Sequence, residues 1–177
     1  MLYLIFGAAA LGLLTLDQWT KLWTVANFAA PTAANIYSTN DPAKPFLPGL
    51  VELTRVHNYG AAWSSFSGAR WFLIIVTAVG MLALAYLGRR IVHHPLGRWP
   101  LAAVIGGGVG NLIDRVRLGY VVDMLDAVFI DFPVFNVADC FVVCGTIVLC
   151  IYYLFYYEKY DAGNWEKKDG SDPADRG

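Results

Sequence analysis

Four long apolar segments, separated by polar connections, are the feature of this 177-residue sequence that most restricts its fold. The hydrocarbon core of a bilayer is about 30 Å thick, and roughly 20 helical residues cross it. Each segment is long enough to cross, given some tilt and polar residues at its ends. The predicted spans are approximately residues 3–28, 70–88, 98–117 and 137–158. The sequence therefore predicts an all-α membrane protein with four transmembrane helices.

The charge content supports this interpretation and excludes some classes of function. Hydrophobic residues make up 57% of the chain and charged residues only 15%, whereas soluble domains carry about 25% charged residues. The formal net charge of -1 does not favour binding to nucleic acid. Cys140, Cys144 and Cys150 lie in the last apolar run, where we expect them to pack as small side chains. No histidine lies near them in the sequence, which disfavours a zinc site.

Basic residues predict which end of the bundle faces the cytoplasm. An even number of spans places both termini on one side, together with the short connection between the second and third spans. The basic residues on this side are Arg89, Arg90, Arg98 and Lys159. Cytoplasmic loops are enriched in Lys and Arg, so we expect both termini in the cytoplasm. Residues 1–160 are predicted to form one membrane-embedded domain, and residues 161–177 a disordered cytoplasmic tail.

The connections 29–69 and 118–136 are predicted to form a cap on the outer side of the membrane. Four prolines between residues 31 and 48 interrupt any helix in the first connection. Residues 50–56 alternate and contain β-branched side chains, which predicts a short strand. Asp126 and Asp131 are interpreted as ordinary loop carboxylates. The cap is therefore expected to be a small unit of sheet and loops.

Ionisable residues inside or beside a membrane span are costly unless they are paired or face water, so each is a functional candidate. Asp17 and Lys21 lie one helical turn apart and can neutralise each other. One hypothesis is a local ion pair that holds the end of the first span. The alternative is a contact to the head groups of a substrate.

The third span combines small and polar residues. Gly106 and Gly110 form a face on which another helix can approach closely. Asn111, Asp114 and Arg115 follow at spacings that place them on one helical face. They direct an amide, a carboxylate and a guanidinium at a single location. A polar network that only stabilises the bundle, with Asp114 and Arg115 as a pair, is the alternative.

Asp123 and Asp139 are two carboxylates without an adjacent basic partner in the sequence. If the third and fourth spans are neighbours, the connection can bring both to the same depth. Two nearby carboxylates in a low dielectric share a proton. Such a pair can hydrolyse a peptide bond, because one member accepts a proton from water while the other polarises the carbonyl. Considered alone, an unpaired Asp at the start of a helix is more often an N-cap, which is the alternative for Asp139.

Asn58 lies in the outer cap, two residues before a glycine. Its amide could hold the backbone of a substrate, and Gly60 permits a turn or a close approach. A turn without a binding role is the alternative. His57 has no acid or nucleophile nearby in the sequence and is interpreted as structural.

Taken together, these segments resemble the lipoprotein signal peptidase family, also called signal peptidase II. Five blocks carry the resemblance in order along nearly the whole chain. They are residues 17–21 (DQWTK), 58–63 (NYGAAW), 106–115 (GGGVGNLIDR), 121–123 (VVD) and 135–139 (FNVAD). The resemblance implies an aspartyl endopeptidase of the bacterial inner membrane. It would remove the signal peptide from prolipoproteins just before their diacylglyceryl-modified Cys.

The resemblance also implies roles for individual residues. Asp123 and Asp139 would be the catalytic pair. Asn58, Asn111, Arg115 and Asn136 would line the site or position the substrate. Asp114 would support Arg115, and Asp17 with Lys21 would hold the outer end of the first helix near the site. The family uses no metal or organic cofactor. Its fold is four transmembrane helices with an outer β-cradle and a short outer helix, and globomycin-type inhibitors occupy the catalytic pair.

A small proton- or cation-coupled transporter is the alternative function, because buried Asp114, Asp123 and Asp139 could relay protons or bind cations. It does not explain why the polar groups gather near one predicted membrane face. A purely structural membrane subunit would need no unpaired acids. Intramembrane proteases of the Gly-x-Gly-Asp type are excluded, since the sequence contains no such tetrapeptide.

Overall fold

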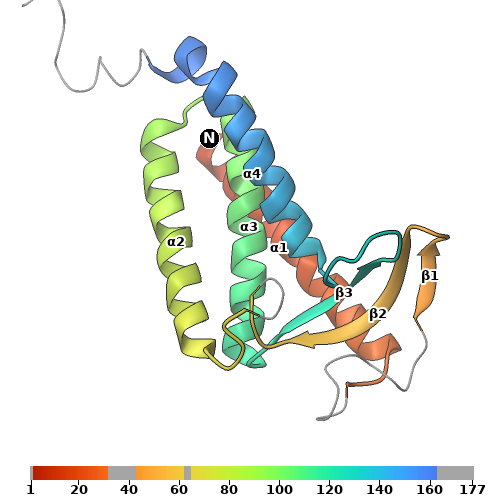
Figure 1. The fold of residues 1–177 in the computed structure, drawn as a ribbon. Coiled ribbons are helices and arrows are strands. Elements are labelled where there is room, and N and C mark those ends of the chain that lie inside the picture. The colour runs from red at the N-terminus through yellow and green to blue at the C-terminus, as the bar shows by residue number, and fades with distance from the viewer. Residues whose placement is uncertain (1, 32–42, 62–64, 163–177) are drawn as a thin grey trace, which may run out of the picture.

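Within residues 2–31, 43–61 and 65–162, which the computed structural model describes, four α-helices lie side by side and a small sheet adjoins one end (Figure 1). The helices are α1 (Leu2–Asn27), α2 (Arg70–Ile91), α3 (Pro95–Arg117) and α4 (Val137–Phe155). The start of α1 and the end of α4 both lie at the end of the bundle away from the sheet (Figure 1). The helix bounds agree with the four predicted apolar segments to within about three residues, while their passage through a bilayer stays a prediction.

Local capping sets where two of these helices begin. His94 Nδ1 accepts a hydrogen bond from the Leu96 amide at 3.3 Å, and Pro95 occupies the first turn of α3. Proline suits this position because the first amides of a helix have no partner within it. α4 begins with a capping box, in which the side chains of Asn136 and Asp139 each accept from the other's backbone amide.

Glycines allow α3 to pack closely against the helices around it. A Cβ at Gly106 would lie 2.8 Å from the Ala10 carbonyl oxygen of α1. A Cβ at Gly107 would lie 2.5 Å from the Ala138 carbonyl oxygen of α4. Both distances are too short for a side chain, so glycine is required for these helix contacts. The glycine run makes α3 the helix on which α1 and α4 converge.

The sheet contains the predicted strand and adds two that the sequence did not indicate. Its strands are β1 (Lys44–Leu47), β2 (Val51–Asn58) and β3 (Val121–Ala127), antiparallel and in this order. β2 begins one residue later than the predicted strand 50–56 and ends with Asn58 rather than before it. Asp126 lies in β3, so its interpretation as a loop carboxylate is wrong. The seven residues of β3 are mostly buried, so they lack the alternation of polar and apolar residues that marks a strand.

The described parts of the cap contain strands and turns but no helix. The short outer helix implied by the family resemblance is thus not found among residues 29–31, 43–61, 65–69 and 118–136. Most of the proline-rich stretch 31–48 lies outside the described residues.

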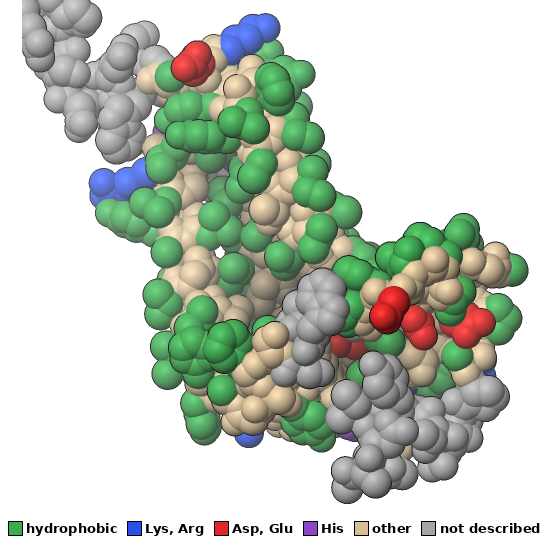
Figure 2. Space-filling view, in the orientation of Figure 1, with side chains coloured by type: hydrophobic (Ala, Val, Ile, Leu, Met, Phe, Trp, Pro, Cys, Tyr) green, Lys and Arg blue, Asp and Glu red, His purple; other side chains and the backbone are tan. Residues whose placement is uncertain are grey.

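The outer surface of the helices is apolar. α2 and α4 have mean hydropathies of 2.2 and 2.1 and are long enough to cross a membrane. Large side chains on them are turned outward, with Leu82 71% and Leu154 73% exposed. Figure 2 shows hydrophobic side chains over the helical body, with charged ones toward its ends. A soluble protein rarely exposes so much apolar surface, which indicates a membrane location.

The start of the predicted disordered tail is wrong by at least two residues. Asp161 and Ala162 belong to a π-helical turn, η2 (Glu158–Ala162), and Asp161 is buried. The Asp161 carboxylate accepts hydrogen bonds from the Tyr152 hydroxyl at 2.6 Å and from the His93 amide at 2.9 Å. These contacts join η2 to the α2–α3 connection. The remaining residues of the predicted tail lie outside those described.

Candidate functional site

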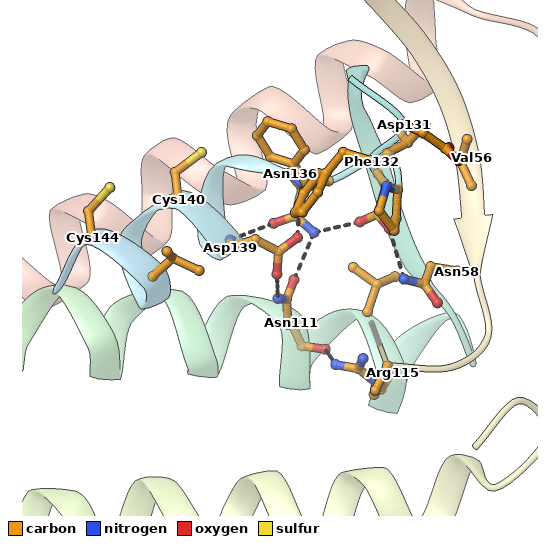
Figure 3. A pocket seen from close by; sticks show the side chains of 17 residues that line it. Val56, Asn58, Asn111, Arg115, Asp131, Phe132, Asn136, Asp139, Cys140 and Cys144 are labelled. Atoms are coloured by element: carbon orange, nitrogen blue, oxygen red, sulfur yellow. Dashed lines mark hydrogen bonds between the residues drawn. The ribbon is translucent and has the colours of Figure 1, made fainter. Parts of the chain in front are cut away.

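A cavity of about 770 Å³ lies between the sheet and the adjoining ends of α3 and α4 (Figure 3). Its lining contains amide, carboxylate and guanidinium groups from four segments of the chain. These are Asn58, Asn111, Arg115, Asp123, Asp131, Asn136 and Asp139. The remaining lining is largely apolar, so the cavity combines a polar wall with an apolar one.

Strand pairing explains how Asp123 and Asp139 reach the same cavity. After β3 the chain reverses, and Phe135 pairs with Leu125 through hydrogen bonds of 2.8 and 3.0 Å. This pairing places Asn136 beside β3, and α4 begins at the next residue. Asp123 and Asp139 therefore line one cavity, while their common depth in a membrane stays a prediction.

Two side-chain amides hold the Asp123 carboxylate. Asn136 Nδ2 donates to Asp123 Oδ1 at 2.6 Å, and Asn58 Nδ2 donates to Asp123 Oδ2 at 3.0 Å. Only 2% of Asp123 is exposed. Burial, together with the nearby charge of Asp139, raises the pKa of Asp123 to about 7, whereas the two amide hydrogen bonds oppose the rise. Asp123 therefore changes protonation near neutral pH.

The Asp139 carboxylate is held in a similar way. Asn111 Nδ2 donates to Asp139 Oδ1 at 2.7 Å, and the Asn136 backbone amide donates to Asp139 Oδ2 at 3.0 Å. Asp139 is thus the third residue of the α4 capping box and a cavity residue at once (Figure 3). The N-cap interpretation of Asp139 is wrong, because Asn136 is the N-cap and Asp139 is the third residue of α4. Its part in the capping box does not remove Asp139 from the site.

Each of the four carboxylate oxygens accepts one hydrogen bond from an amide N–H. A carboxylate oxygen has two lone pairs, so each oxygen retains one for a proton, a water molecule or a substrate. An amide N–H binds an ionised carboxylate without transferring a proton to it. The pair can therefore hold one proton between two oxygens and exchange it with a bound molecule.

Arg115 and Asp114 take different partners, so the expected pair between them is wrong. Arg115 Nη2 donates to the Gly60 carbonyl at 2.8 Å, which links α3 to the end of the cap. Asp114 instead accepts from Lys21 Nζ at 3.0 Å and from the Val122 amide at 3.2 Å. Consecutive helical positions point about 100° apart, which explains the separation.

Asp17, Lys21 and Asp114 form a buried charged cluster behind the cavity wall. Lys21 Nζ lies 3.0 Å from both Asp17 Oδ2 and Asp114 Oδ2. Asp17 Oδ1 also accepts the amide of Ala138 at 3.1 Å, at the start of α4. The expected ion pair of Asp17 and Lys21 is present. It also connects α1 to α3 through Asp114 and to α4 through Ala138, so its effect is not confined to the end of α1. Nothing in this geometry exposes Lys21 to a substrate head group.

Sequence reasoning missed several contributors. Gln18 Nε2 donates to Asp17 at 3.1 Å and to Asp114 at 3.0 Å, and its only sequence signal is its place between Asp17 and Lys21. Cys140 and Cys144 line the cavity (Figure 3), and the expected packing of the cysteines is wrong for Cys144 and Cys150, which are exposed. Asp131, predicted to be an ordinary loop residue, also lines the cavity. Such positions follow from tertiary contacts that no local pattern reports.

His57 lies outside the carboxylate network, as its interpretation as a structural residue expects. Its ring stacks on Tyr120 with centroids 3.8 Å apart. Burial and the neighbouring charge of Arg55 lower the pKa of His57 to about 4, so the ring is neutral at pH 7. Among residues 2–31, 43–61 and 65–162, no group of three His, Cys, Asp or Glu side chains is placed to hold a metal ion.

Comparison with known sequences gives consistent matches over most of the chain. A sequence model of the family described as signal peptidase (SPase) II matches residues 9–155. Lipoprotein signal peptidases of Streptococcus pyogenes serotype M5 (strain Manfredo) and serotype M1 are each 37% identical to this chain over 164 residues. These alignments cover 90% of this chain and 97% of each relative.

Two solved structures, each described as a bacterial membrane enzyme determined by the in meso method, share the fold. The first has a TM-score of 0.74 and 28% identity, and the match covers 88% of this chain and 90% of the other. The second has a TM-score of 0.71 and 29% identity, with coverages of 84% and 92%. The similarity therefore extends over helices and sheet and is not confined to one motif.

Proposed function

The chain belongs to the signal peptidase II family, and we propose that it acts as an aspartic endopeptidase with Asp123 and Asp139 as its catalytic pair. Its substrates would be prolipoproteins whose Cys carries diacylglycerol, cut just before that residue. The observation that supports the proposal best is the pair of carboxylates held by amides in one cavity. No cofactor is part of the proposed reaction.

In the proposed reaction the ionised carboxyl accepts a proton from water as the water oxygen bonds to the scissile carbonyl carbon. The protonated carboxyl gives its proton to the carbonyl oxygen, which produces a tetrahedral diol. As the diol collapses, one hydroxyl proton returns to the pair and the other carboxyl proton passes to the leaving nitrogen. The C–N bond breaks, and the pair again holds one proton. A pKa of about 7 for Asp123 supports a shared proton at neutral pH.

Neighbouring groups on the cavity wall would position the peptide. Arg115 lines the cavity, and its Nε, which is buried, has no hydrogen-bond partner among the described residues. A small turn of the guanidinium would let this unused donor bind a substrate carbonyl. Asn58 and Asn111 hold the carboxylates and would keep them oriented while substrate binds. Asn136 would serve both carboxylates at once. Asp17, Lys21 and Asp114 would support this wall from behind.

The proposed orientation places the cavity toward the outer face of the bacterial inner membrane. α1 to α4 would each cross the bilayer, and the end with both termini would lie in the cytoplasm, because it carries Arg89, Arg90, Arg98 and Lys159. The apolar part of the cavity, including Val143 and Cys144 of α4, suits a lipid-modified substrate and globomycin-type inhibitors. Residues 1–160 would act as one domain.

The transporter alternative is not supported. The family matches are to peptidases, and the charged cluster and the cavity lie together at one end of the bundle. A translocation path needs polar groups through the whole membrane thickness.

The test is cleavage of a purified diacylglyceryl-modified prolipoprotein by the protein in detergent or proteoliposomes. Asp123→Asn and Asp139→Asn should each abolish cleavage while leaving the fold intact by circular dichroism. Asp126→Asn is the matched control, because Asp126 lies on the same strand as Asp123 and outside the cavity lining. Full activity of either site variant would refute the catalytic assignment. An unlipidated substrate cut at the same rate would refute the lipid requirement.

A further inference from the structure

Lys21 is a buried cation that does not line the cavity. Only 3% of the residue is exposed. Its ammonium has three donors, and three oxygens lie within hydrogen-bond distance. Two belong to Asp17 and Asp114, each at 3.0 Å, and the third is Asn111 Oδ1 at 2.9 Å. Charge neutralisation accounts for the first two contacts but not for the third.

The third contact fixes which way the Asn111 amide faces. An ammonium can only donate, so it requires the oxygen of Asn111 on its side. Asn136 Nδ2, also a donor, approaches the same oxygen at 3.1 Å. The Asn111 nitrogen must then face Asp139, to which it donates at 2.7 Å. A flipped amide would bring its nitrogen against the Lys21 ammonium and its oxygen against the Asp139 carboxylate.

We propose that Lys21 is a positioning residue that orients the Asn111 amide toward Asp139 and, by its charge, favours ionisation of the carboxyl pair. This inference rests on the proposed function, because it assigns Lys21 an effect on the same pair. Lys21 acts through Asn111 and touches neither the cavity nor the substrate.

The proposed effect of the Lys21 charge has support at Asp123, which lies on β3 and not on a helix. The charge of Lys21 lowers the pKa of Asp123, against the larger effects of burial and of Asp139, which raise it. The titratable groups around the pair come from α1, α3, β3, the loop after β3, and α4, whereas β2 contributes the neutral amide of Asn58. They are Asp17 and Lys21 on α1, Asp114 and Arg115 on α3, Asp123 on β3, Asp131 in the following loop, and Asp139 and Cys140 on α4. Lys21 and Arg115 are the two cations of this set.

The test measures kcat and KM against pH for a lipidated prolipoprotein. Lys21→Met should lower kcat about tenfold at neutral pH, the loss expected for one charge-assisted hydrogen bond. It should also move the alkaline limb of the kcat profile, where Asp123 loses its proton, to higher pH. KM should stay within about twofold, because Lys21 does not line the cavity. Lys21→Arg keeps the charge and should keep the limb near its wild-type position.

Two further variants control for folding and for charge. Asp17→Asn/Lys21→Met removes one carboxylate with the cation, and the new amide oxygen can still accept from Ala138. It replaces Lys21→Met if the single variant does not fold. Lys44→Met removes a cation from exposed β1 and should leave the limb in place.

Three results would overturn the inference. An alkaline limb that stays in place while kcat falls would reduce Lys21 to a structural residue. A rise in KM with kcat unchanged would make it a binding residue. A limb that moves as far in Lys21→Arg as in Lys21→Met would assign the effect to packing rather than charge. None of these results bears on the catalytic pair itself, which the Asp123→Asn and Asp139→Asn variants test separately.

Discussion

Replacing Asn136 by serine separates two contributions that this buried side chain makes. Its Oδ1 accepts the Asp139 amide at 3.0 Å and caps α4. Its Nδ2 donates to Asp123 Oδ1 at 2.6 Å. Serine is as good a helix cap as asparagine, so Asn136→Ser should keep the cap. The variant loses the donor to Asp123, because a serine side chain is too short to reach both partners.

The structure sets the direction and size of the effect. The Asn136 hydrogen bond favours ionised Asp123 and so lowers the pKa of this carboxyl. Hydrogen bonds to charged groups contribute about 1.5–3 kcal/mol. Losing one should therefore move the alkaline limb of the kcat profile, where Asp123 loses its proton, up by about one to two pH units. At a pH above the wild-type limb, the fraction of its own plateau kcat that the variant retains should be about tenfold or more higher than for wild type.

The assay is the pH dependence of prolipoprotein cleavage, measured together with thermal unfolding in detergent. Asn136→Ala is the matched variant, because it loses both the donor and the cap. It should move the limb as Asn136→Ser does and lower the free energy of unfolding by about 1 kcal/mol more. An alkaline limb that does not move in Asn136→Ser would refute the reasoning that this amide sets the proton affinity of Asp123.

Two further predictions concern stability. The pKa of Asp123 is about 7 in the folded chain, compared with an ordinary value of 3.8. Between these two pH values the folded chain therefore binds a proton that the unfolded chain does not. This proton makes the free energy of unfolding of the wild type fall as pH rises from about 4 to 7. Asp123→Asn cannot titrate, so its stability should not fall in this way. The difference in free energy of unfolding between Asp123→Asn and wild type should rise by up to about 4 kcal/mol from pH 4 to pH 7. A difference that stays constant with pH would contradict the effect of burial on Asp123. A Cβ at Gly110 would overlap the Asp17 carboxylate, so Gly110→Ala should lower the free energy of unfolding by about 1–3 kcal/mol. Gly12→Ala, whose methyl would meet nothing within 4 Å, should not, and equal losses would argue against the close α1–α3 approach.

The parts of the fold that the sequence predicts are those with long, local signals. Each apolar run exceeds the length of a soluble strand several-fold, so the four helices follow from length and composition. The alternation in residues 50–56 identifies most of β2. β3 was missed because its seven residues are mostly buried, and continuous burial removes the alternation that marks a strand. Asp161 was placed in the tail because the last residues are rich in Gly, Asp and Lys, and composition does not indicate which single carboxylate is buried.

For the site, sequence identified the charged and amide residues but not their partners. Asp114 was matched to Arg115 because they are adjacent, whereas the fold gives Asp114 to Lys21, 93 positions earlier in the chain. Asn136 was expected as a lining residue, yet its contacts to both carboxylates depend on the pairing of Phe135 with Leu125. Long-range pairing of this kind is decided by packing, and no spacing along the chain reports it.

The placement of Lys21 behind Asn111 suits a pair of carboxylates that must exchange a proton. A lysine in direct contact with Asp123 would hold this carboxyl ionised and prevent it from acting as an acid. Three neutral amides surround the two carboxyls instead, and an amide tolerates both the ionised and the protonated form of its partner. Because Asn111 lies between the Lys21 ammonium and Asp139, the charge favours ionisation of the pair but does not hold either carboxyl permanently ionised. A cation moved into the first layer, as in Asn111→Lys, should therefore abolish cleavage at neutral pH even in a folded protein.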